Sequence, residues 1–301
     1  MTPGTETAHA EQRPTRRRTV DFIALTRPRV VLMVLVTTLV GYFLGSQERL
    51  DWFGLLKTLL GVALAAGGTA ALNQYLERDA DRKMARTRLR PLPDGRLKPP
   101  EALAFGVAIT ACGLLALTLL VNPLSCLITA ISVVSYLFLY TPLKRKSPLS
   151  TLIGAIPGAL PPVAGWAATR GELALEAWVL FAILFLWQIP HSLAIAWLYR
   201  IDYAQAGFRL LSVIDPDGRS MGRPIVSHCL ALLIVGLLPT VIGLTGSVYF
   251  VAAFVLGIAF LGYGVGLAVS CSAKAARRLL HASLVYLPVL VLMMVLDNVI
   301  F

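Results

Sequence analysis

Three oxygen-bearing side chains recur at intervals of four residues where an apolar stretch gives way to a charged one. These residues are Asn73, Glu77 and Asp81. On an α-helix, residues spaced in this way lie on one face, whereas the intervening Asp79 points away from that face. Two carboxylates and an amide suit Mg²⁺, a hard cation that proteins usually bind through a few carboxylates together with substrate phosphates. The spacing therefore predicts a magnesium site that bridges the protein to a diphosphate.

A run of cations follows this acidic face and ends at Pro91 and Pro93. Arg binds phosphate oxygens through forked hydrogen bonds, so these cations could neutralise the rest of a diphosphate. The residues assigned to this role are Arg82, Lys83, Arg86 and Arg90, with Lys144 and Arg145 from a later basic loop. A solvated loop beside a membrane would explain some of the cations. It would explain the carboxylates poorly, because acids at the end of a membrane helix are costly unless they are paired or functional.

A second polar segment, WQIPHSLAIAWLYRIDYAQAG, covers residues 187–207. It places Asp202 next to Arg200 and Tyr203, and it places His191 closer to the apolar end. Asp202 is a candidate partner for the first acidic group, since the topology below puts both segments on one side. A lone histidine in an apolar helix is more often a hydrogen-bonded structural residue than a ligand, so both roles stay open for His191.

The stretches that carry these groups are too apolar for a water-soluble domain. Hydrophobic residues make up 57% of the 301 residues and charged residues only 14%, which points to lipid as the solvent. A spanning helix needs about 20 mostly apolar residues. Such runs lie near 22–45, 53–76, 102–121, 123–140, 149–168, 174–199, 224–244, 247–270 and 280–300. We therefore expect an all-α membrane bundle of about nine transmembrane helices.

Basic residues indicate the orientation of this bundle, because cytoplasmic loops of membrane proteins carry an excess of Lys and Arg. With the N-terminus inside, 24 of the 27 Lys and Arg residues fall on the cytoplasmic side, and only Arg49, Lys57 and Arg170 fall outside. The pattern predicts an N-in, C-out topology, with a disordered basic cytoplasmic arm over 1–20 and a transmembrane domain over 21–301. Topology also explains the net charge of +11, so nucleic-acid binding is not expected.

Four segments resemble the intramembrane prenyltransferases of the UbiA superfamily over nearly the whole chain. They are LTRPRVVLMVLVTTLVGYFLG at 25–45, NQYLERDADRKMARTRLRPLP at 73–93, YTPLKRKSPLSTLIGAIPGALPPVAGW at 140–166, and WQIPH with DYAQAG at 187–207. The superfamily's N-x-x-x-D-x-x-x-D motif, which binds magnesium and the prenyl diphosphate, maps onto Asn73, Glu77 and Asp81, with Glu77 in place of the usual Asp. Many relatives carry a second D-x-x-x-D motif; here Asp202 is followed by Ala206, so the second acid is absent.

Within this superfamily the chain looks most like the branch that farnesylates heme. The resemblance implies that the mapped motif and Asp202 hold Mg²⁺ against farnesyl diphosphate, while a vinyl group of heme B attacks the farnesyl cation and water completes the new side chain. We also expect His191 to contact the tetrapyrrole, because a neutral imidazole deeper than the diphosphate site suits that acceptor. The implied setting is the inner membrane of a bacterium, with the active site on the cytoplasmic side and a downstream heme-modifying enzyme as a further partner.

The implied reaction needs charge stabilisation where the diphosphate leaves and a dry, apolar chamber where the farnesyl cation forms. The aromatic residues expected near that chamber are Tyr75, Tyr136, Tyr140 and Trp187. Their π faces could attract a cation, although packing at the membrane interface is the commoner role for any one of them.

Two other functions compete with this interpretation. A relative that prenylates an aromatic quinone precursor such as 4-hydroxybenzoate would share the first motif, but the missing second acid and the WQIPH and DYAQAG segments weigh against it. A transporter could have as many spans, yet transporters commonly place ionisable groups near the midplane and show internal repeats. The acids here gather at one end of the predicted spans instead.

Overall fold

The computed structural model describes residues 15–46 and 50–300, and every regular element within them is helical. The elements are α1 (Thr15–Leu25), α2 (Pro28–Gly45), α3 (Trp52–Asp81), α4 (Pro99–Leu120), α5 (Pro123–Val134), the π-helix η1 (Ser135–Tyr140), α6 (Thr141–Leu143), α7 (Ser150–Ala159), α8 (Pro161–Arg170), α9 (Leu175–Leu198), α10 (Arg200–Gln205), α11 (Leu211–Ile214), α12 (Arg219–Val235), α13 (Leu238–Val241), α14 (Ser247–Ser270) and α15 (Ala273–Ile300). The described residues contain nine helical segments long and apolar enough to cross a membrane, which confirms the predicted bundle.

The first span is shorter than predicted. The predicted run over 22–45 is divided, because α1 ends at Leu25 and α2 begins at Pro28. Proline lacks a backbone N–H and disfavours helical geometry at the residue before it; Arg27 accordingly adopts a left-handed backbone conformation with φ of 49°. The predicted disordered arm over 1–20 also needs correction, since residues 15–20 belong to α1. Its remainder, 1–14, lies outside the described residues.

Two consecutive spans in the middle of the chain are irregular. The fourth passes from α5 through the π-helix η1 into α6, and the fifth is divided into α7 and α8 at Pro161. A π-turn or a proline interrupts the regular backbone hydrogen bonds, and membrane proteins tolerate this where the backbone is buried or lines a cavity. Both irregular spans line the cavity described below.

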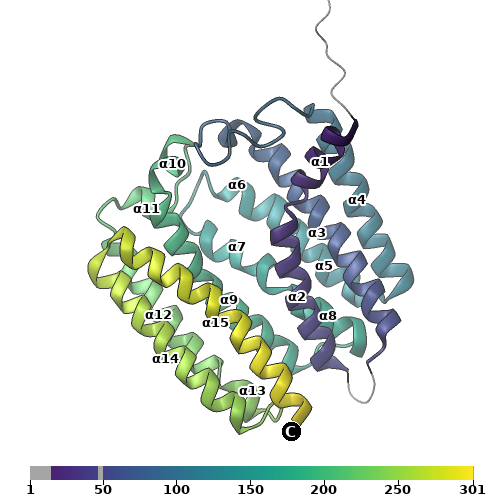
Figure 1. Cartoon of the computed structure of the whole chain (residues 1–301), viewed down its shortest axis with the longest axis vertical. Helices are drawn as coiled ribbons and strands as arrows, with labels where there is room; N and C mark the ends of the chain where they lie inside the picture. The colour runs from purple at the N-terminus through teal and green to yellow at the C-terminus, as the bar shows by residue number, and fades with distance from the viewer. Residues whose placement is uncertain (1–14, 47–49, 301) are drawn as a thin grey trace, which may run out of the picture.

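Figure 1 shows the helices packed as one bundle, with α12, α14 and α15 together on one flank and α3 and α4 on the other. Between the flanks, α2 packs on α8, and α9 contacts α7, α12 and α15. Small residues permit the closest approaches: a Cβ atom on Gly41 of α2 would lie 1.9 Å from the carbonyl oxygen of Pro162 in α8. Such close packing of small residues is typical of membrane helix interfaces.

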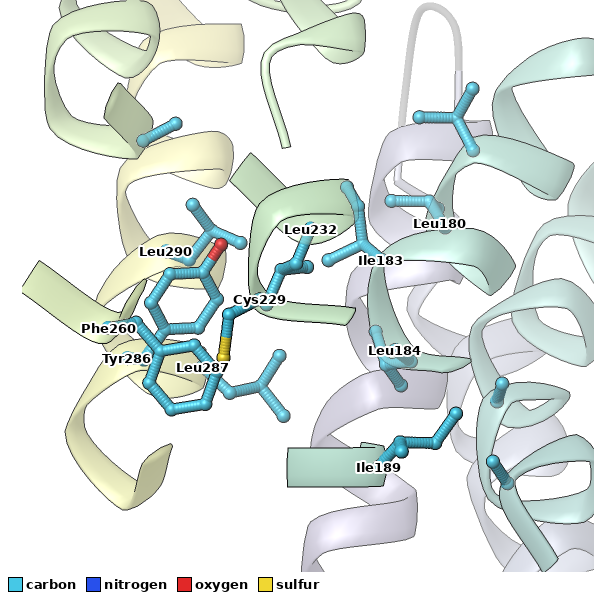
Figure 2. Close-up of a cluster of buried hydrophobic side chains, with 14 of the residues drawn as sticks. Leu180, Ile183, Leu184, Ile189, Cys229, Leu232, Phe260, Tyr286, Leu287 and Leu290 are labelled. Atoms are coloured by element: carbon cyan, nitrogen blue, oxygen red, sulfur yellow. The ribbon is translucent and has the colours of Figure 1, made fainter. Parts of the chain in front are cut away.

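The main apolar core lies where α9 meets the C-terminal helices. Figure 2 shows Ile183 and Leu184 of α9 near Cys229 and Leu232 of α12, with the stacked rings of Phe260 and Tyr286 beyond them; all belong to one buried cluster.

The polar loops meet at one end of the bundle, together with α1, α6, α10 and α11 (Figure 1). A small buried cluster of Ala80, Met84, Ala206 and Phe208 joins the loop after α3 to the loop after α10. The backbone N–H of Arg209 also donates a hydrogen bond of 2.8 Å to the carbonyl oxygen of Lys144. Three loops far apart in the sequence are therefore held against one another over the same end.

Candidate active site

A cavity of about 500 Å³ opens beneath these loops and extends into the bundle. Its walls come from α2, α3, α5, η1, α7, α8 and α9, with further residues from the loops at the polar end. On α3 the lining runs from Asp81 and Glu77 back to Val62; at about 1.5 Å per helical residue, the separation of 19 residues between Asp81 and Val62 makes this wall roughly 28 Å long. The cavity is charged at one end and carries apolar side chains deeper in the bundle.

The two carboxylates predicted to share a helix face do line the same cavity. Glu77 and Asp81 are both buried, whereas Asp79 is exposed, as the helical spacing predicted. Glu77 Oε1 accepts a hydrogen bond of 2.8 Å from Lys144 Nζ, and Asp81 Oδ2 accepts one of 2.8 Å from Arg90 Nη1. Among the described residues, only one oxygen of each carboxylate has a side-chain partner. The acids are therefore charge-compensated, yet each keeps an oxygen for a further ligand.

Asn73 lies one turn deeper than Glu77 and is fully buried, but it is not among the cavity-lining residues. Its Nδ2 donates to Thr141 Oγ1 at 3.1 Å, and the hydroxyl of Tyr136 donates to its Oδ1 at 3.4 Å. Asn73 thus ties α3 to the irregular fourth span, directly behind the acidic pair.

Half of the six predicted diphosphate-binding cations line the cavity. Arg86, Arg90 and Lys144 do so, while Arg82, Lys83 and Arg145 are exposed and are not cavity-lining residues. Arg86 is also exposed, but its Nη2 donates to the hydroxyl of Tyr203 at 3.5 Å, which directs the guanidinium towards the cavity mouth. After Asp81 the chain leaves the helix, so helical spacing no longer indicates which way these side chains point.

The pKa values of two of these cations, Lys144 and Arg90, are shifted in opposite directions. Burial alone lowers the pKa of Lys144, but interactions with Tyr140, Glu77 and Tyr136, which include the hydrogen bond with Glu77, together leave that pKa raised. Burial lowers the pKa of Arg90, the nearby Arg27 lowers it further, and Asp81 offsets part of the effect. The mouth therefore gathers more positive charge than its two carboxylates neutralise, which favours an anionic ligand.

Arg27, which no sequence pattern singled out, lines the same cavity. Its left-handed backbone lies between α1 and α2, and its buried Nε has no hydrogen-bond partner among the described residues. A buried guanidinium nitrogen without a partner is costly, so its position at a cavity indicates a ligand-binding role. Pro28 was the available signal, because it predicts a helix break at Arg27.

Two of the four predicted aromatic residues lie at the cavity. Tyr136 and Tyr140 line it with ring centroids 5.3 Å apart, and Lys144 Nζ lies 4.3 Å from the centre of the Tyr140 ring. Tyr75 instead packs beside the buried cluster around Leu25. Trp187 faces the C-terminal helices, where its Nε1 donates to the carbonyl oxygen of Ser283.

The second polar segment, residues 187–207, does not bring its carboxylate to the cavity. Asp202 is half-buried on α10 and is not a cavity-lining residue, whereas the adjacent Tyr203 is. His191 hydrogen-bonds through Nδ1 with Ser283 Oγ at 2.7 Å and stacks on Trp187, and it too is absent from the lining. From α9, the polar residues that do line the cavity are Gln188 and Ser192.

The donor set at the mouth fits a hard divalent cation in company with a ligand. Among the residues that the structure describes, no three His, Cys, Asp or Glu side chains gather closely enough to form a metal site by themselves. Glu77 and Asp81 supply two carboxylates beside a cavity rich in cations. Mg²⁺ is commonly held by one or two carboxylates plus substrate phosphates, so the site suits a metal that arrives with a phosphorylated ligand.

Comparison with known sequences identifies what this arrangement is similar to. The profile of the UbiA prenyltransferase family matches residues 34–292. The protoheme IX farnesyltransferase of Solibacter usitatus is 50% identical over 92% of this chain and 98% of its own length. The protoheme IX farnesyltransferase of Koribacter versatilis is 43% identical over 93% of this chain and 94% of its own.

Solved structures share the fold at low sequence identity. A structure of digeranylgeranylglyceryl phosphate synthase superposes with a TM-score of 0.80 at 18% identity, covering 95% of this chain and all of that one (100%). A UbiA homologue from Archaeoglobus fulgidus, bound to GPP and Mg²⁺, superposes with a TM-score of 0.66 at 16% identity, covering 91% of this chain and 99% of that one. These likenesses concern the helical architecture alone.

Proposed function

The chain belongs to the UbiA prenyltransferase family, and we propose that it transfers the farnesyl group of farnesyl diphosphate to a vinyl group of heme B, which makes heme O. The observation that carries the proposal is the cavity, which places paired carboxylates and several cations at one end and apolar walls beyond them. That combination suits a substrate with a diphosphate head and an apolar tail. The curated relatives named for this activity align with nearly the entire chain.

The diphosphate would bind at the charged end, held by Lys144, Arg90, Arg86 and Arg27. Glu77 and Asp81 would hold Mg²⁺ through their remaining oxygens, as Mg²⁺ appears in structures of UbiA homologues. When bound, the metal would neutralise negative charge on the diphosphate oxygens. These cations are already in position before the reaction. They therefore stabilise the negative charge that develops on the departing diphosphate without having to move.

The farnesyl cation would form next to Tyr136 and Tyr140, whose rings line the cavity just below the charged end. The negative face of an aromatic ring attracts a cation, most strongly where water is excluded. Asn73 supports this arrangement as a positioning residue, since its contacts with Thr141 and Tyr136 fix the tyrosine relative to the carboxylates on α3. Asp202 would join the metal site only if α10 moved it to the mouth upon substrate binding.

The proposed contact between His191 and heme concerns a residue that does not line the cavity in this structure. The imidazole is hydrogen-bonded to Ser283 and packed on Trp187, so it now serves to join α9 to α15. Heme contact would require the ring to leave this partner. We propose to compare His191→Ala with Ser283→Ala: weaker heme binding and altered heme absorption bands in His191→Ala alone would support a direct contact, and equal small effects would assign the pair a structural role.

We further propose that the cavity mouth faces the cytoplasm of a bacterial cell, with the chain in the inner membrane. The support is the excess of Lys and Arg in the loops at the mouth end. In a background whose four native cysteines are replaced, Arg145→Cys should react with a membrane-impermeant reagent in inverted vesicles and not in intact spheroplasts. Reaction in spheroplasts alone would reverse the proposed orientation.

The activity itself is tested with the purified protein, farnesyl diphosphate, Mg²⁺ and two candidate acceptors offered separately. Heme B should give a less polar heme whose mass has increased by the farnesyl group and one hydroxyl group, because the added water loses a proton. Conversion of 4-hydroxybenzoate in place of heme B would contradict the proposal and favour prenylation of a quinone precursor. A control without Mg²⁺ tests whether the metal is needed.

A further inference from the structure

Two polar side chains on α9 reach the cavity from within a membrane span. Gln188 and Ser192 lie one helical turn apart, and both are cavity-lining residues. Gln188 Nε2 donates to the carbonyl oxygen of Leu184 at 3.2 Å. Among the described residues, neither Gln188 Oε1 nor Ser192 Oγ has a hydrogen-bond partner. Polar groups at this depth are costly without a partner, so the pair indicates that the cavity supplies one.

The pair lies well below the charged mouth. Gln188 precedes the end of α9 at Leu198 by ten residues, which is about 15 Å along the helix axis. The walls from α2 and α3 are mainly apolar and include Val30, Val34 and Val62. Thr69 of α3 also lines the cavity, but its hydroxyl donates to the carbonyl oxygen of Ala65 in its own helix. A farnesyl chain fits those apolar walls. The hydrogen-bonding groups on α9 instead suit a polar ligand or a water molecule.

A glycine on the neighbouring span leaves room for the Gln188 carboxamide. A Cβ atom on Gly158 of α7 would lie 2.1 Å from Gln188 Oε1, closer than any real contact. The carboxamide is therefore seated against Gly158, with its position set by both helices. The hydrogen bond from Nε2 to Leu184 and the space left by Gly158 together allow Oε1 to remain unpaired at the cavity.

The chemistry of the proposed function supplies a need for such groups. When the terminal carbon of a vinyl group forms a bond with C1 of the farnesyl group, positive charge appears on the vinyl carbon next to the ring. Water can add to that carbon, which forms a C–O bond as the water loses a proton and gives an alcohol. Alternatively, the neighbouring carbon loses a proton and an alkene forms. The departed diphosphate accepts the proton in both cases. The position of one water molecule decides between the products.

We propose that Gln188 Oε1 and Ser192 Oγ hold this water and direct its oxygen at the cation. A buried water commonly makes two to four hydrogen bonds, and side chains one turn apart on a helix can share one. Gln188 and Ser192 are then positioning residues that determine which product forms. The inference rests on the proposed function, because only farnesyl transfer to a vinyl group creates this cation.

The test is the ratio of alkene to alcohol among the farnesylated hemes, measured by mass spectrometry, in which the alkene is lighter by one water. Gln188→Met keeps the length of the side chain but removes its carboxamide. We expect it to raise the alkene-to-alcohol ratio about tenfold, the effect of one lost hydrogen bond in the competing step. Ser192→Ala should also raise the ratio, since it too leaves only one of the two anchors. A run in water enriched in heavy oxygen verifies that the hydroxyl comes from solvent.

Two further variants separate positioning from general damage. Gly158→Ala leaves Gln188 in the chain but displaces its carboxamide, so it should also raise the ratio. Ser135→Ala is the matched control, because Ser135 Oγ bonds only to carbonyl oxygens of its own helical segment and does not line the cavity. It should keep the parent ratio. A change in Ser135→Ala as large as that in Ser192→Ala would overturn the proposal.

The outcomes distinguish this inference from the proposed function. A parent-like product ratio in Gln188→Met would overturn the inference while farnesyl transfer stands. Complete loss of farnesylated heme in folded Gln188→Met would also overturn it, because the carboxamide would then bind the acceptor. Absence of farnesylated heme with the parent protein would instead contradict the proposed function.

Discussion

The cavity and the C-terminal flank of the bundle are built from the same kind of apolar helix, yet they differ in regularity and in polarity. Every cavity-lining residue precedes α12, and none of the described residues of α12, α14 or α15 reaches the cavity. The flank packs around Cys229, Phe260 and Tyr286, which are almost completely buried (Figure 2). The cavity region holds charged groups around an open space, whereas apolar side chains fill the core of the C-terminal flank.

Helices are interrupted in both regions, since the flank's α12 gives way to α13 beside Pro239, but only around the cavity do the breaks carry lining residues. In the C-terminal flank, α15 runs for 28 residues through Pro288 without interruption. Around the cavity, Pro28 and Pro161 each begin a new helix, and the fourth span contains a π-helix. Arg27 and the junction between α7 and α8 lie at such helix breaks, and both line the cavity. The irregular backbone is therefore found next to the proposed ligand. The comparison predicts that substitutions in the first region change the reaction and those in the second change stability.

The largest effect is expected for Asp81→Asn. The change preserves shape but removes the charge that would hold Mg²⁺, and losing such an electrostatic contact typically lowers the rate about 100- to 1000-fold. The measurement is farnesylated heme formed per minute across a Mg²⁺ titration. Glu77→Asp, which keeps a carboxylate, should retain most of the activity.

Asp79→Asn is the matched control for this prediction, because Asp79 belongs to the same helix but is exposed. It should leave both the rate and the Mg²⁺ dependence near those of the parent. Equal, magnesium-independent losses at positions 79 and 81 would mean that the acids act only as a charged loop.

A slightly smaller loss is expected for Lys144→Met. Lys144 carries one of several cations at the mouth, so Arg27, Arg86 and Arg90 would still hold part of the diphosphate; we expect a loss of about 100-fold in kcat/KM. The variant also leaves Glu77 as a buried carboxylate without its ion-pair partner, which should lower the thermal unfolding temperature.

A double variant separates the two roles of Lys144. Adding Glu77→Gln removes the unpaired charge, so the unfolding temperature should recover. The activity should stay low, because the variant lacks both a cation for the diphosphate and one of the two carboxylates that would hold Mg²⁺. Recovery of activity together with stability would show that Lys144 serves only to neutralise Glu77, and the distinction between a reactive and a structural region would weaken at this pair.

Sequence patterns predicted the regular parts of the site and missed the parts that depend on backbone irregularity. Glu77 and Asp81 were placed correctly because helical geometry applies up to Asp81. The pairing of Glu77 with Lys144, 67 positions away, depends on tertiary packing that no local pattern encodes. Arg27 was missed because a continuous first span hid the break before Pro28.

The spans themselves were predictable for a physical reason: a bilayer requires long apolar stretches, and those are visible in the sequence. Which face of a span meets the cavity was harder to predict, since lipid-facing and core-facing residues of a membrane helix are both apolar. His191 illustrates the difficulty. It shares α9 with Gln188 and Ser192, yet it contacts Ser283 while they line the cavity.

The C-terminal flank should respond in stability and not in rate. Phe260→Ala removes a buried ring that stacks on Tyr286 at 5.1 Å between centroids, and such a cavity typically costs about 3 to 5 kcal/mol. The unfolding temperature should fall markedly, while the rate per folded molecule, measured well below that temperature, should stay near that of the parent. A loss of rate comparable with that of Lys144→Met would show that this flank controls the cavity after all.

The smallest effect is expected for Tyr286→Phe, which probes the same core without opening a space. The Tyr286 hydroxyl is buried and has no hydrogen-bond partner among the described residues, so removing it should leave the unfolding free energy unchanged or raise it by up to about 1 kcal/mol. Tyr249→Phe is the matched contrast, because the Tyr249 hydroxyl donates to the carbonyl oxygen of Gly236 at 2.8 Å and its loss leaves that acceptor unpaired. Thermal unfolding of both variants beside the parent measures the difference. If Tyr286→Phe proved the more destabilising of the two, its hydroxyl would have a partner of its own, and the flank would contain a polar contact as specific as those at the cavity.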